Sequence, residues 1–281
     1  MKLNTRGIEN ILELARHNKL KVFAPSTIAV FGDSSPKDQT PDTTIMRPST
    51  IYGVTKVYLE LLGEYYVRKY GVDFRSVRYP GIISNVGMPG GGTTDYACAI
   101  YHEAITHGKY TCFLKEDSAM PMMYMPDCLD AVIDLMEAPE EKLTQRTYNV
   151  TGFSFTPKEV HEAIAKHIPG FETKYEPDYR QAIADSWPRS LDDSIARKDW
   201  GQKKIKGGDR VKDGSIDGII SQLPSTHFIS GVYFFWCSLL LLGWNPKFNL
   251  DTMSVHDSNP LPGSHLPLQF NHLTIALFQL Y

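Results

Sequence analysis

The chain has 281 residues, of which 42% are hydrophobic and 22% are charged, and its formal net charge is -3. This composition is typical of a globular protein with enough apolar side chains for a sizeable core. The lack of a basic excess argues against a nucleic-acid partner. The basic run 197–212 is interleaved with Asp199 and Asp209, which favours a solvated segment over a binding patch.

The cysteines and histidines do not form the pattern of a metal site or of a disulfide framework. No cysteines have C-x-x-C spacing, and the nine histidines are scattered without an H-E-x-x-H motif. We therefore expect no metal, and buried free thiols in a reducing compartment. The four cysteines are Cys98, Cys112, Cys128 and Cys237.

The first predicted elements are a helix and a short strand. Apolar residues recur at helical spacing in 4–18, which predicts an amphipathic helix. An apolar strand follows at 21–24 and stops at Ser26 and Thr27. The polar, Pro-rich segment 32–47 predicts a loop that either borders an active site or is disordered, and the sequence leaves both interpretations open.

The segment around Tyr52 predicts a helix that can carry acid–base chemistry. Ser49 or Thr50 can cap its start, and Gly71 can end it. Tyr52 and Lys56 are four residues apart, so they share one face of the helix. A free phenol titrates near pKa ~10, and a nearby ammonium favours the phenolate, so this pair could provide a base near neutral pH.

Spacing alone does not single out this pair, because Tyr65 and Lys69 repeat it on the same helix. Amphipathic helices contain both residue types, so we interpret Tyr65 as a packing residue and Lys69 as a solvated one. The context of Tyr52 is different. A strand that ends in hydroxyl residues precedes it, and a predicted strand with the sequence Arg-Tyr-Pro-Gly follows it within 73–83.

A strand-end hydroxyl, Tyr-x-x-x-Lys and Arg-Tyr-Pro-Gly, in this order, resemble the extended short-chain dehydrogenase/reductase family. The resemblance implies an α/β fold, with part of a Rossmann-type, doubly wound parallel sheet and a small substrate-side α/β region. It also implies NAD as the cofactor. In this family Ser or Thr, Tyr and Lys act together with the nicotinamide.

The resemblance assigns roles to particular residues. Tyr52 would be the base, and Lys56 would lower the pKa of Tyr52 and hold the nicotinamide ribose. Ser26 or Thr27 would donate a hydrogen bond to the reacting oxygen, although either could be an ordinary strand-end cap. The nicotinamide would be lined by Pro80, Gly81 and Ile82, although the Pro-Gly pair could also be only a turn.

The remaining elements alternate between helices and strands. The predicted helices are at 95–106, after the Met-rich segment 120–131, from Thr156 onward, and within 181–201. The predicted strands are at 110–114 and 147–151. Thr156 and Pro157 form a helix start, and the methionines are interpreted as core filler or as part of a substrate-side segment.

Five motifs from about Asn4 to Gly201 are similar to those of the short-chain type of L-threonine 3-dehydrogenase. They include Pro-Gly-Gly-Gly-Thr-Thr-Asp-Tyr-Ala and Ala-Asp-Ser-Trp-Pro. The similarity implies oxidation of L-threonine to L-2-amino-3-ketobutyrate. The substrate-binding residues would be Ser26, Tyr52, Gly81 and Thr94, with Thr93 and Asp95 as weaker candidates and helix capping as the alternative role for Thr94.

Two other functions stay open. The first is a nucleotide-sugar epimerase or reductase of the same family. In those relatives an Arg holds the diphosphate, and no Arg occurs between Tyr79 and Gln145, which argues against this function. The second is a catalytically silent, truncated isoform that acts only by pairing with another subunit.

The family's Gly-rich phosphate-binding turn is not found after any predicted strand, so we expect the chain to begin within a domain. Gly87–Gly92 is interpreted as a substrate-side loop. Strand 21–24 would then lack its earlier neighbour and become a hydrophobic sheet edge. By resemblance, we also expect a homodimer formed through the Tyr52 helix and a mitochondrial location. Residues 1–7 contain no signal-peptide core or long presequence.

The family pattern breaks after Gly201 and resumes briefly at 244–253. Residues 202–243 are therefore predicted to be an insertion. The apolar run 228–244 within it could be a membrane span, a buried segment or non-family sequence, although a membrane span is the least favoured. We expect four regions. They are the remainder of the NAD-binding domain at 1–85, a substrate-side region with returning Rossmann elements at 86–201, the insertion, and 244–281 with its divergent tail.

Overall fold

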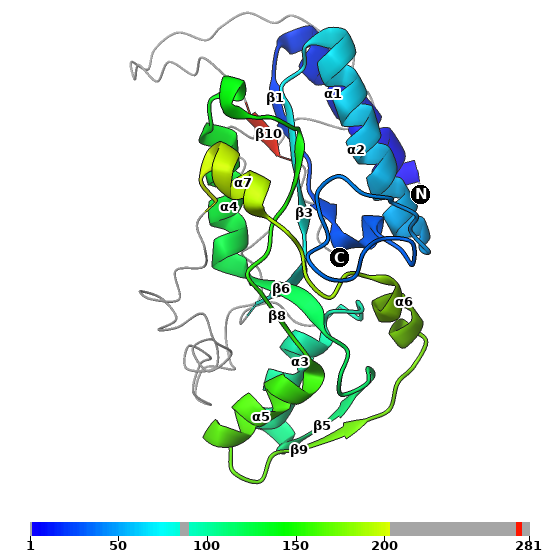
Figure 1. Ribbon diagram of the computed structural model, residues 1–281, viewed down its shortest axis with the longest axis vertical. Helices are drawn as coiled ribbons and strands as arrows, with labels where there is room; N and C mark the ends of the chain where they lie inside the picture. Colours follow the sequence, from blue (N-terminus) through cyan, green and yellow to red (C-terminus); the bar gives the residue numbers. More distant parts are fainter. Residues whose placement is uncertain (1, 85–89, 203–273, 277–281) are drawn as a thin grey trace, which may run out of the picture.

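The computed structural model describes residues 2–84, 90–202 and 274–276. The larger lobe is built around a parallel sheet in the order β10-β1-β3-β2, and β7 also pairs with β3 (Figure 1). The strands are β1 (Lys21–Phe23), β2 (Ser26–Thr27), β3 (Phe74–Tyr79), β7 (Thr147–Asn149) and β10 (Thr274–Ala276). The apolar run 228–244, and most of the predicted insertion and tail, lie outside the described residues.

Helices cover both faces of this sheet (Figure 1). Helices α1 (Lys2–Asn18) and α2 (Ile51–Tyr70) pack together on one face, and α4 (Met125–Glu137) and α7 (Ser194–Trp200) lie on the other. Each helix places apolar side chains against the buried strands, so two cores lie on the two faces of the sheet. The predicted doubly wound α/β fold is confirmed.

The predicted boundaries of the Tyr52 helix are also confirmed. Thr50 is the N-cap of α2, and its side chain accepts a hydrogen bond from Gly53 N. Gly71 ends the helix in the left-handed conformation, with φ of 69°. This conformation suits a residue without a Cβ atom.

The predicted strand at 73–83 is divided at Pro80. β3 ends at Tyr79, and β4 (Gly81–Ile83) pairs with β6 (Met120–Tyr124) in a second sheet. Proline cannot donate to a sheet ladder, so a strand is readily divided there. The division sends the chain from the central sheet to the smaller lobe.

The smaller lobe contains two small sheets and the remaining helices. One sheet has the order β4-β6-β8, and the other pairs β5 with β9. Its further elements are α3 (Tyr96–His107), β5 (Lys109–Cys112), β8 (Phe153–Phe155), α5 (Pro157–His167), β9 (Glu172–Tyr175) and α6 (Arg180–Ser186). Two 3-10 turns belong to the larger lobe: η1 (Ile28–Val30), which packs against α2, and η2 (Glu140–Lys142), which follows α4. α5 begins with a capping box between Thr156 and Glu159, as the sequence predicts for its start.

Several methionine and cysteine side chains have the predicted environment. Met120, Met122 and Met123 are buried, so they fill the core. Cys98, Cys112 and Cys128 are buried and free, as predicted, and Cys237 lies outside the described residues. Among the helices that the structure describes, none combines the length and apolarity needed to cross a bilayer.

The prediction of an exposed edge at β1 is wrong. β10 pairs with β1 in parallel, with Lys21 opposite Thr274 and Phe23 opposite Ala276. β1 therefore has a strand on both sides, because β3 lies on the other. The neighbour comes from the far end of the sequence, and no local pattern indicates such a pairing.

Candidate active site

Tyr52 lies in the first turn of α2, where the helix crosses the chain just beyond β2. A Cβ atom on Gly53 would lie 2.1 Å from Ala29 O and 2.5 Å from Pro48 Cβ. Only glycine therefore allows this turn to approach η1 so closely. The approach brings the Tyr52 turn near the strand end that carries the predicted hydroxyl residues.

Lys56 lies one turn beyond Tyr52 and is 4% exposed. Its Nζ donates a hydrogen bond of 2.7 Å to Pro25 O, at the junction of β1 and β2. The same Nζ is 5.7 Å from the centroid of the Tyr52 ring. The structure thus places the predicted Tyr and Lys side by side, with the amine fixed by the backbone next to Ser26.

Burial lowers the pKa of Lys56 from 10.5 to about 8, and the carboxylate of Glu60 opposes this effect. A group with this pKa remains mostly protonated at pH 7. Lys56 therefore keeps a positive charge beside the phenol, in surroundings where charge interactions are stronger than in water.

The two predicted hydroxyl residues differ in their surroundings. Ser26 is buried, and its hydroxyl donates to the Glu60 carboxylate, so it points into the protein. Thr27 is half-buried, and its Oγ1 accepts a 3.2 Å hydrogen bond from Ala29 N. The Thr27 hydroxyl hydrogen can still be donated, so Thr27 fits the predicted donor role better than Ser26.

Gly81 and Thr94 come from separate motifs, and the structure brings them together. A Cβ atom on Gly81 would lie 2.9 Å from Thr94 Cγ2 and 2.2 Å from Met122 Sδ. The glycine therefore lets Met122 and Thr94 pack directly against the backbone at the start of β4, where any other side chain would collide with them. Pro80 beside it is buried, and Ile82 is half-buried.

The weaker substrate candidates have structural roles. Asp95 Oδ2 accepts hydrogen bonds from Gly90 N at 2.7 Å and Gly92 N at 2.9 Å, so its carboxylate holds the glycine turn. Thr93 is buried. The N-cap of α3 is Asp95, so capping does not explain Thr94.

Sequence reasoning missed a buried ion pair next to this site. Glu60 on α2 is 1% exposed, and Arg78 on β3 donates to it from Nε at 3.0 Å and from Nη2 at 2.9 Å. A signal was present in the sequence, because Glu60 follows Lys56 by four residues and lies between two leucines.

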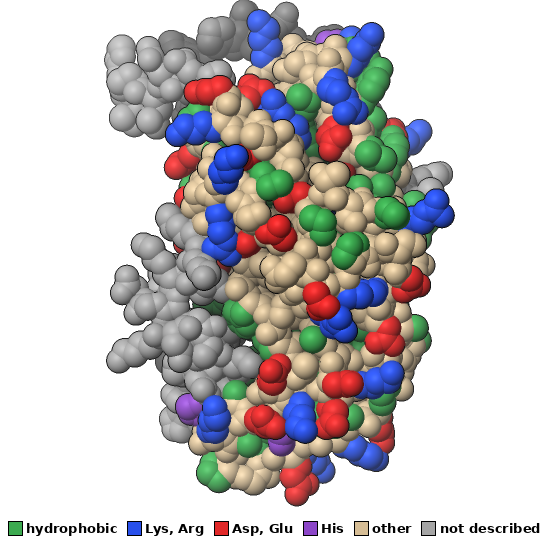
Figure 2. All heavy atoms as spheres, viewed as in Figure 1, with side chains coloured by type: hydrophobic (Ala, Val, Ile, Leu, Met, Phe, Trp, Pro, Cys, Tyr) green, Lys and Arg blue, Asp and Glu red, His purple; other side chains and the backbone are tan. Residues whose placement is uncertain are grey.

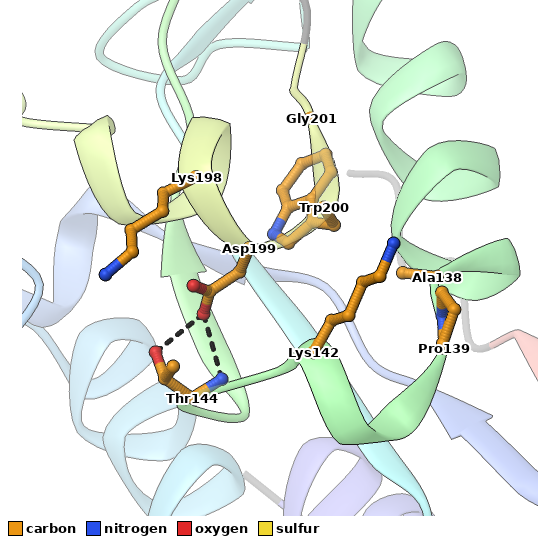
Figure 3. A pocket seen from close by; sticks show the side chains of 8 residues that line it. All are labelled: Ala138, Pro139, Lys142, Thr144, Lys198, Asp199, Trp200 and Gly201. Atoms are coloured by element: carbon orange, nitrogen blue, oxygen red, sulfur yellow. Dashed lines mark hydrogen bonds between the residues drawn. The ribbon is translucent and has the colours of Figure 1, made fainter.

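A surface hollow of about 550 Å³ lies elsewhere, beside the end of α4 and α7 (Figure 3). It is lined by Ala138, Pro139, Lys142, Thr144, Lys198, Asp199, Trp200 and Gly201. Figure 3 shows the amines of Lys142 and Lys198 pointing apart, so they do not converge on one ligand. The Asp199 carboxylate already accepts from Thr144 and Tyr148. We therefore place the candidate active site at Tyr52 and not here.

Comparisons with known proteins identify the family of the chain. The model of the "NAD dependent epimerase/dehydratase family" matches residues 1–151. The chain is 55% identical over 202 residues to "L-threonine 3-dehydrogenase, mitochondrial" of Bos taurus, covering 72% of this chain and 54% of that protein. It is 52% identical to an uncharacterized epimerase/dehydratase of Staphylococcus saprophyticus, covering 77% of this chain and 69% of that protein.

Solved structures give the same result. The crystal structure of L-threonine dehydrogenase from Phytophthora infestans superposes with a TM-score of 0.75 at 60% identity, covering 79% of this chain and 70% of that one. The chain spans about half the length of the curated mammalian relatives that it matches. The sequence, the fold and these matches agree, and the chain belongs to the NAD dependent epimerase/dehydratase family.

Proposed function

We propose that this chain has the proton-transfer site of an NAD-dependent L-threonine 3-dehydrogenase, which oxidises L-threonine to L-2-amino-3-ketobutyrate. The observation that carries the proposal is the position of Lys56, whose amine is bound to Pro25 O and lies beside the Tyr52 ring. The names of relatives that are more than 50% identical support the substrate.

In this proposal Tyr52, as phenolate, accepts the proton of the threonine side-chain hydroxyl. The Lys56 ammonium stabilises the phenolate by its charge. Thr27 donates a hydrogen bond to the reacting oxygen, which becomes a carbonyl oxygen, and Thr94 contacts the rest of the substrate. NAD, when bound, supplies the acceptor for the hydride that leaves the same carbon.

The described residues fit one end of NAD. Pro80, Gly81 and Ile82 follow the end of β3 directly, and in this proposal they line the nicotinamide. Lys56 has two further N–H donors for the ribose. In the described ranges, no strand is followed by a Gly-rich turn that could bind the pyrophosphate. The contacts that we propose are therefore limited to the nicotinamide and its ribose.

The proposal is tested by mixing the purified chain with NAD and L-threonine and following NADH absorbance, with NAD affinity measured by calorimetry. We expect turnover that Tyr52→Phe abolishes. Tyr65→Phe is the matched control, because Tyr65 has the same spacing to a lysine on the same helix and is 46% exposed. Turnover that survives Tyr52→Phe would exclude this residue as the base.

A second function, pairing with another subunit, is supported by the outer face of α2. Five apolar side chains recur there at a spacing of three and four residues, and each is at least 36% exposed. They are Ile51, Val54, Tyr58, Leu61 and Tyr65, and we call them the α2 stripe. Such a seam is typical of helices that pack against a partner. We propose that the chain forms a homodimer through the α2 stripe. If the dimeric chain does not bind NAD, a catalytically silent isoform that acts only by pairing with another subunit is favoured.

The nucleotide-sugar alternative has less support. No Arg between Tyr79 and Gln145 is present to hold a diphosphate, and Arg78 is already bound to Glu60. Thermal stabilisation by UDP-sugars would argue for it.

We also propose a mitochondrial location, on the names of the Bos taurus and Sus scrofa relatives. Fractionation of cells that express the chain is the test.

A further inference from the structure

Tyr52, Lys56 and Glu60 follow one another at intervals of four residues along α2, so they form one row on the helix. The third member, Glu60, is 1% exposed. A carboxylate at such a position is unfavourable unless other groups pair with it and donate hydrogen bonds to it. Its partners therefore indicate what this acid does.

Arg78 is the first partner, and it is itself anchored. Besides the two bonds to Glu60, its Nη1 donates to Asp42 O at 2.7 Å and to Asn149 Oδ1 at 3.3 Å. The guanidinium thus joins α2 to the 32–47 loop and to β7. Glu60 is fixed in place by a group that is held from three sides.

Ser26 is the second partner, and its neighbours are the contacts of the site. Its hydroxyl donates to Glu60. The residue before it, Pro25, accepts the Lys56 hydrogen bond, and the residue after it is Thr27. Successive side chains of a strand point to opposite faces, so fixing Ser26 inward directs Thr27 outward.

The third relation is electrostatic. Glu60 is the carboxylate that opposes the effect of burial on the Lys56 pKa. The other titratable or charged groups around this row are Tyr52 and Glu64 on the same helix, Arg78 on β3 and Asp42 on the loop. The positive charge of Arg78 is neutralised by its pairing with Glu60.

We propose that Glu60 is a positioning residue for the Tyr52–Lys56 pair: it fixes Ser26 so that Pro25 O meets the Lys56 amine and Thr27 faces the substrate, and it keeps Lys56 positively charged. The catalytic meaning of this role rests on the proposed function. The geometric and electrostatic parts do not, because they concern groups that can be observed without turnover.

The test is Glu60→Gln in the full chain, which keeps the shape of the side chain and removes its charge. The readout is the NMR titration of the Lys56 side chain in protein with 15N- and 13C-labelled lysine, assigned with Lys56→Met. We expect the titration midpoint of Lys56 to move to lower pH. Where the wild-type chain is active, we also expect kcat at pH 8 to fall by roughly tenfold with KM little changed.

Glu64→Gln is the matched control. Glu64 lies one turn further along α2 and contacts the exposed Arg68 at 3.6 Å, so its removal should leave the Lys56 titration unchanged. An unshifted midpoint in Glu60→Gln would overturn the proposal. Should that variant not fold, Glu60→Gln combined with Arg78→Met leaves no unpaired buried charge and is measured in the same way. If the wild-type chain shows no turnover but Glu60→Gln still shifts the titration midpoint of Lys56, only the proposed function is refuted, and the role of Glu60 stands.

Discussion

Lys56 predicts how stability depends on pH at the scale of a single residue. The pKa of its amine is about 8 in the folded chain and 10.5 in the unfolded chain. Between these values the unfolded chain holds more protons than the folded one, so the free energy of unfolding rises with pH there. Lys56→Met should remove about 2 kcal/mol of the rise between pH 8 and pH 10.

This change is measured by urea unfolding at both pH values. Lys69→Met is the control, because Lys69 is exposed on the same helix and should leave the rise intact. If the free energy of unfolding of the wild-type chain does not rise more between pH 8 and pH 10 than that of Lys56→Met, the lowered pKa of the buried Lys56 amine is contradicted.

The two hydroxyl residues should respond differently to substitution. In an active chain, Thr27→Val should reduce kcat by about 100-fold with little change in stability, because it removes a donor aimed at the substrate. Ser26→Ala should reduce stability by about 1–2 kcal/mol, because it removes a donor from the buried Glu60 carboxylate. Kinetics and thermal melting of both variants separate the roles, and the reverse result would assign the donor role to Ser26.

At this scale the sequence predicts what depends on near neighbours. Tyr52 and Lys56 share a face because they are four residues apart, and Thr50 caps the helix because its side chain reaches the next turn. The sequence does not predict that Ser26 would turn inward. That choice depends on Glu60 and Arg78, which come from two other elements and meet only in the folded chain.

Helix α2 carries a prediction at the scale of an element. Leu61, at 52% exposure, is the fourth member of the α2 stripe. In a dimer formed through this stripe, Leu61→Glu would bury a charge in the interface, so we expect the dimer to dissociate at least tenfold more readily. Light scattering after size exclusion, over a range of concentrations, measures the change.

Ile133→Glu on α4 is the control, because Ile133 is 51% exposed and lies outside the stripe. It should leave the oligomeric state unchanged. Figure 2 shows several hydrophobic side chains at the surface in the upper right of the view, over α1 and α2, among charged side chains of both signs. Dissociation by Ile133→Glu and not by Leu61→Glu would place the interface elsewhere.

The elements show which local patterns are reliable. α1, α2 and α5 have helical spacing and clear ends, so their positions could be predicted. β8 and β9 could not, because each has only three or four residues and no distinctive alternation.

The prediction that Tyr65 is a packing residue is wrong in one respect. Its ring contacts Tyr66 and Tyr70 edge-on, but it lies on the outer face of α2.

The pairing of β1 with β10 gives a prediction for the whole molecule. Val22 N and Ala24 N donate to β3, at Asp73 O and Arg75 O. By alternation, the N–H groups of Lys21 and Phe23 face β10. Ile275→Pro removes a backbone donor from β10 and should weaken this ladder. Hydrogen exchange at Lys21 and Phe23 should then be at least tenfold faster.

The amides of Val22 and Ala24 are internal controls, because their bonds to β3 remain. Equal acceleration at all four positions would mean that the whole sheet has loosened. Unchanged exchange at Lys21 and Phe23 would mean that β10 does not protect β1 in solution.

The fold class could be predicted from the order of strands and helices, but the partner of β1 could not. The two strands are separated by most of the chain, and a three-residue strand has no sequence signal of its own. The sequence predicts β1 as an open sheet edge, and in the structure β10, a segment with no predicted role, pairs with it.

The β1–β10 contact also has a consequence for biosynthesis. The ribosome makes β1, which ends at Phe23, long before β10, which begins at Thr274, so β1 lacks this neighbour while the residues between them are translated. During this interval, nascent copies on one messenger RNA expose the same backbone N–H and C=O groups of β1 to one another. Association between nascent chains is therefore a hazard during the synthesis of this protein.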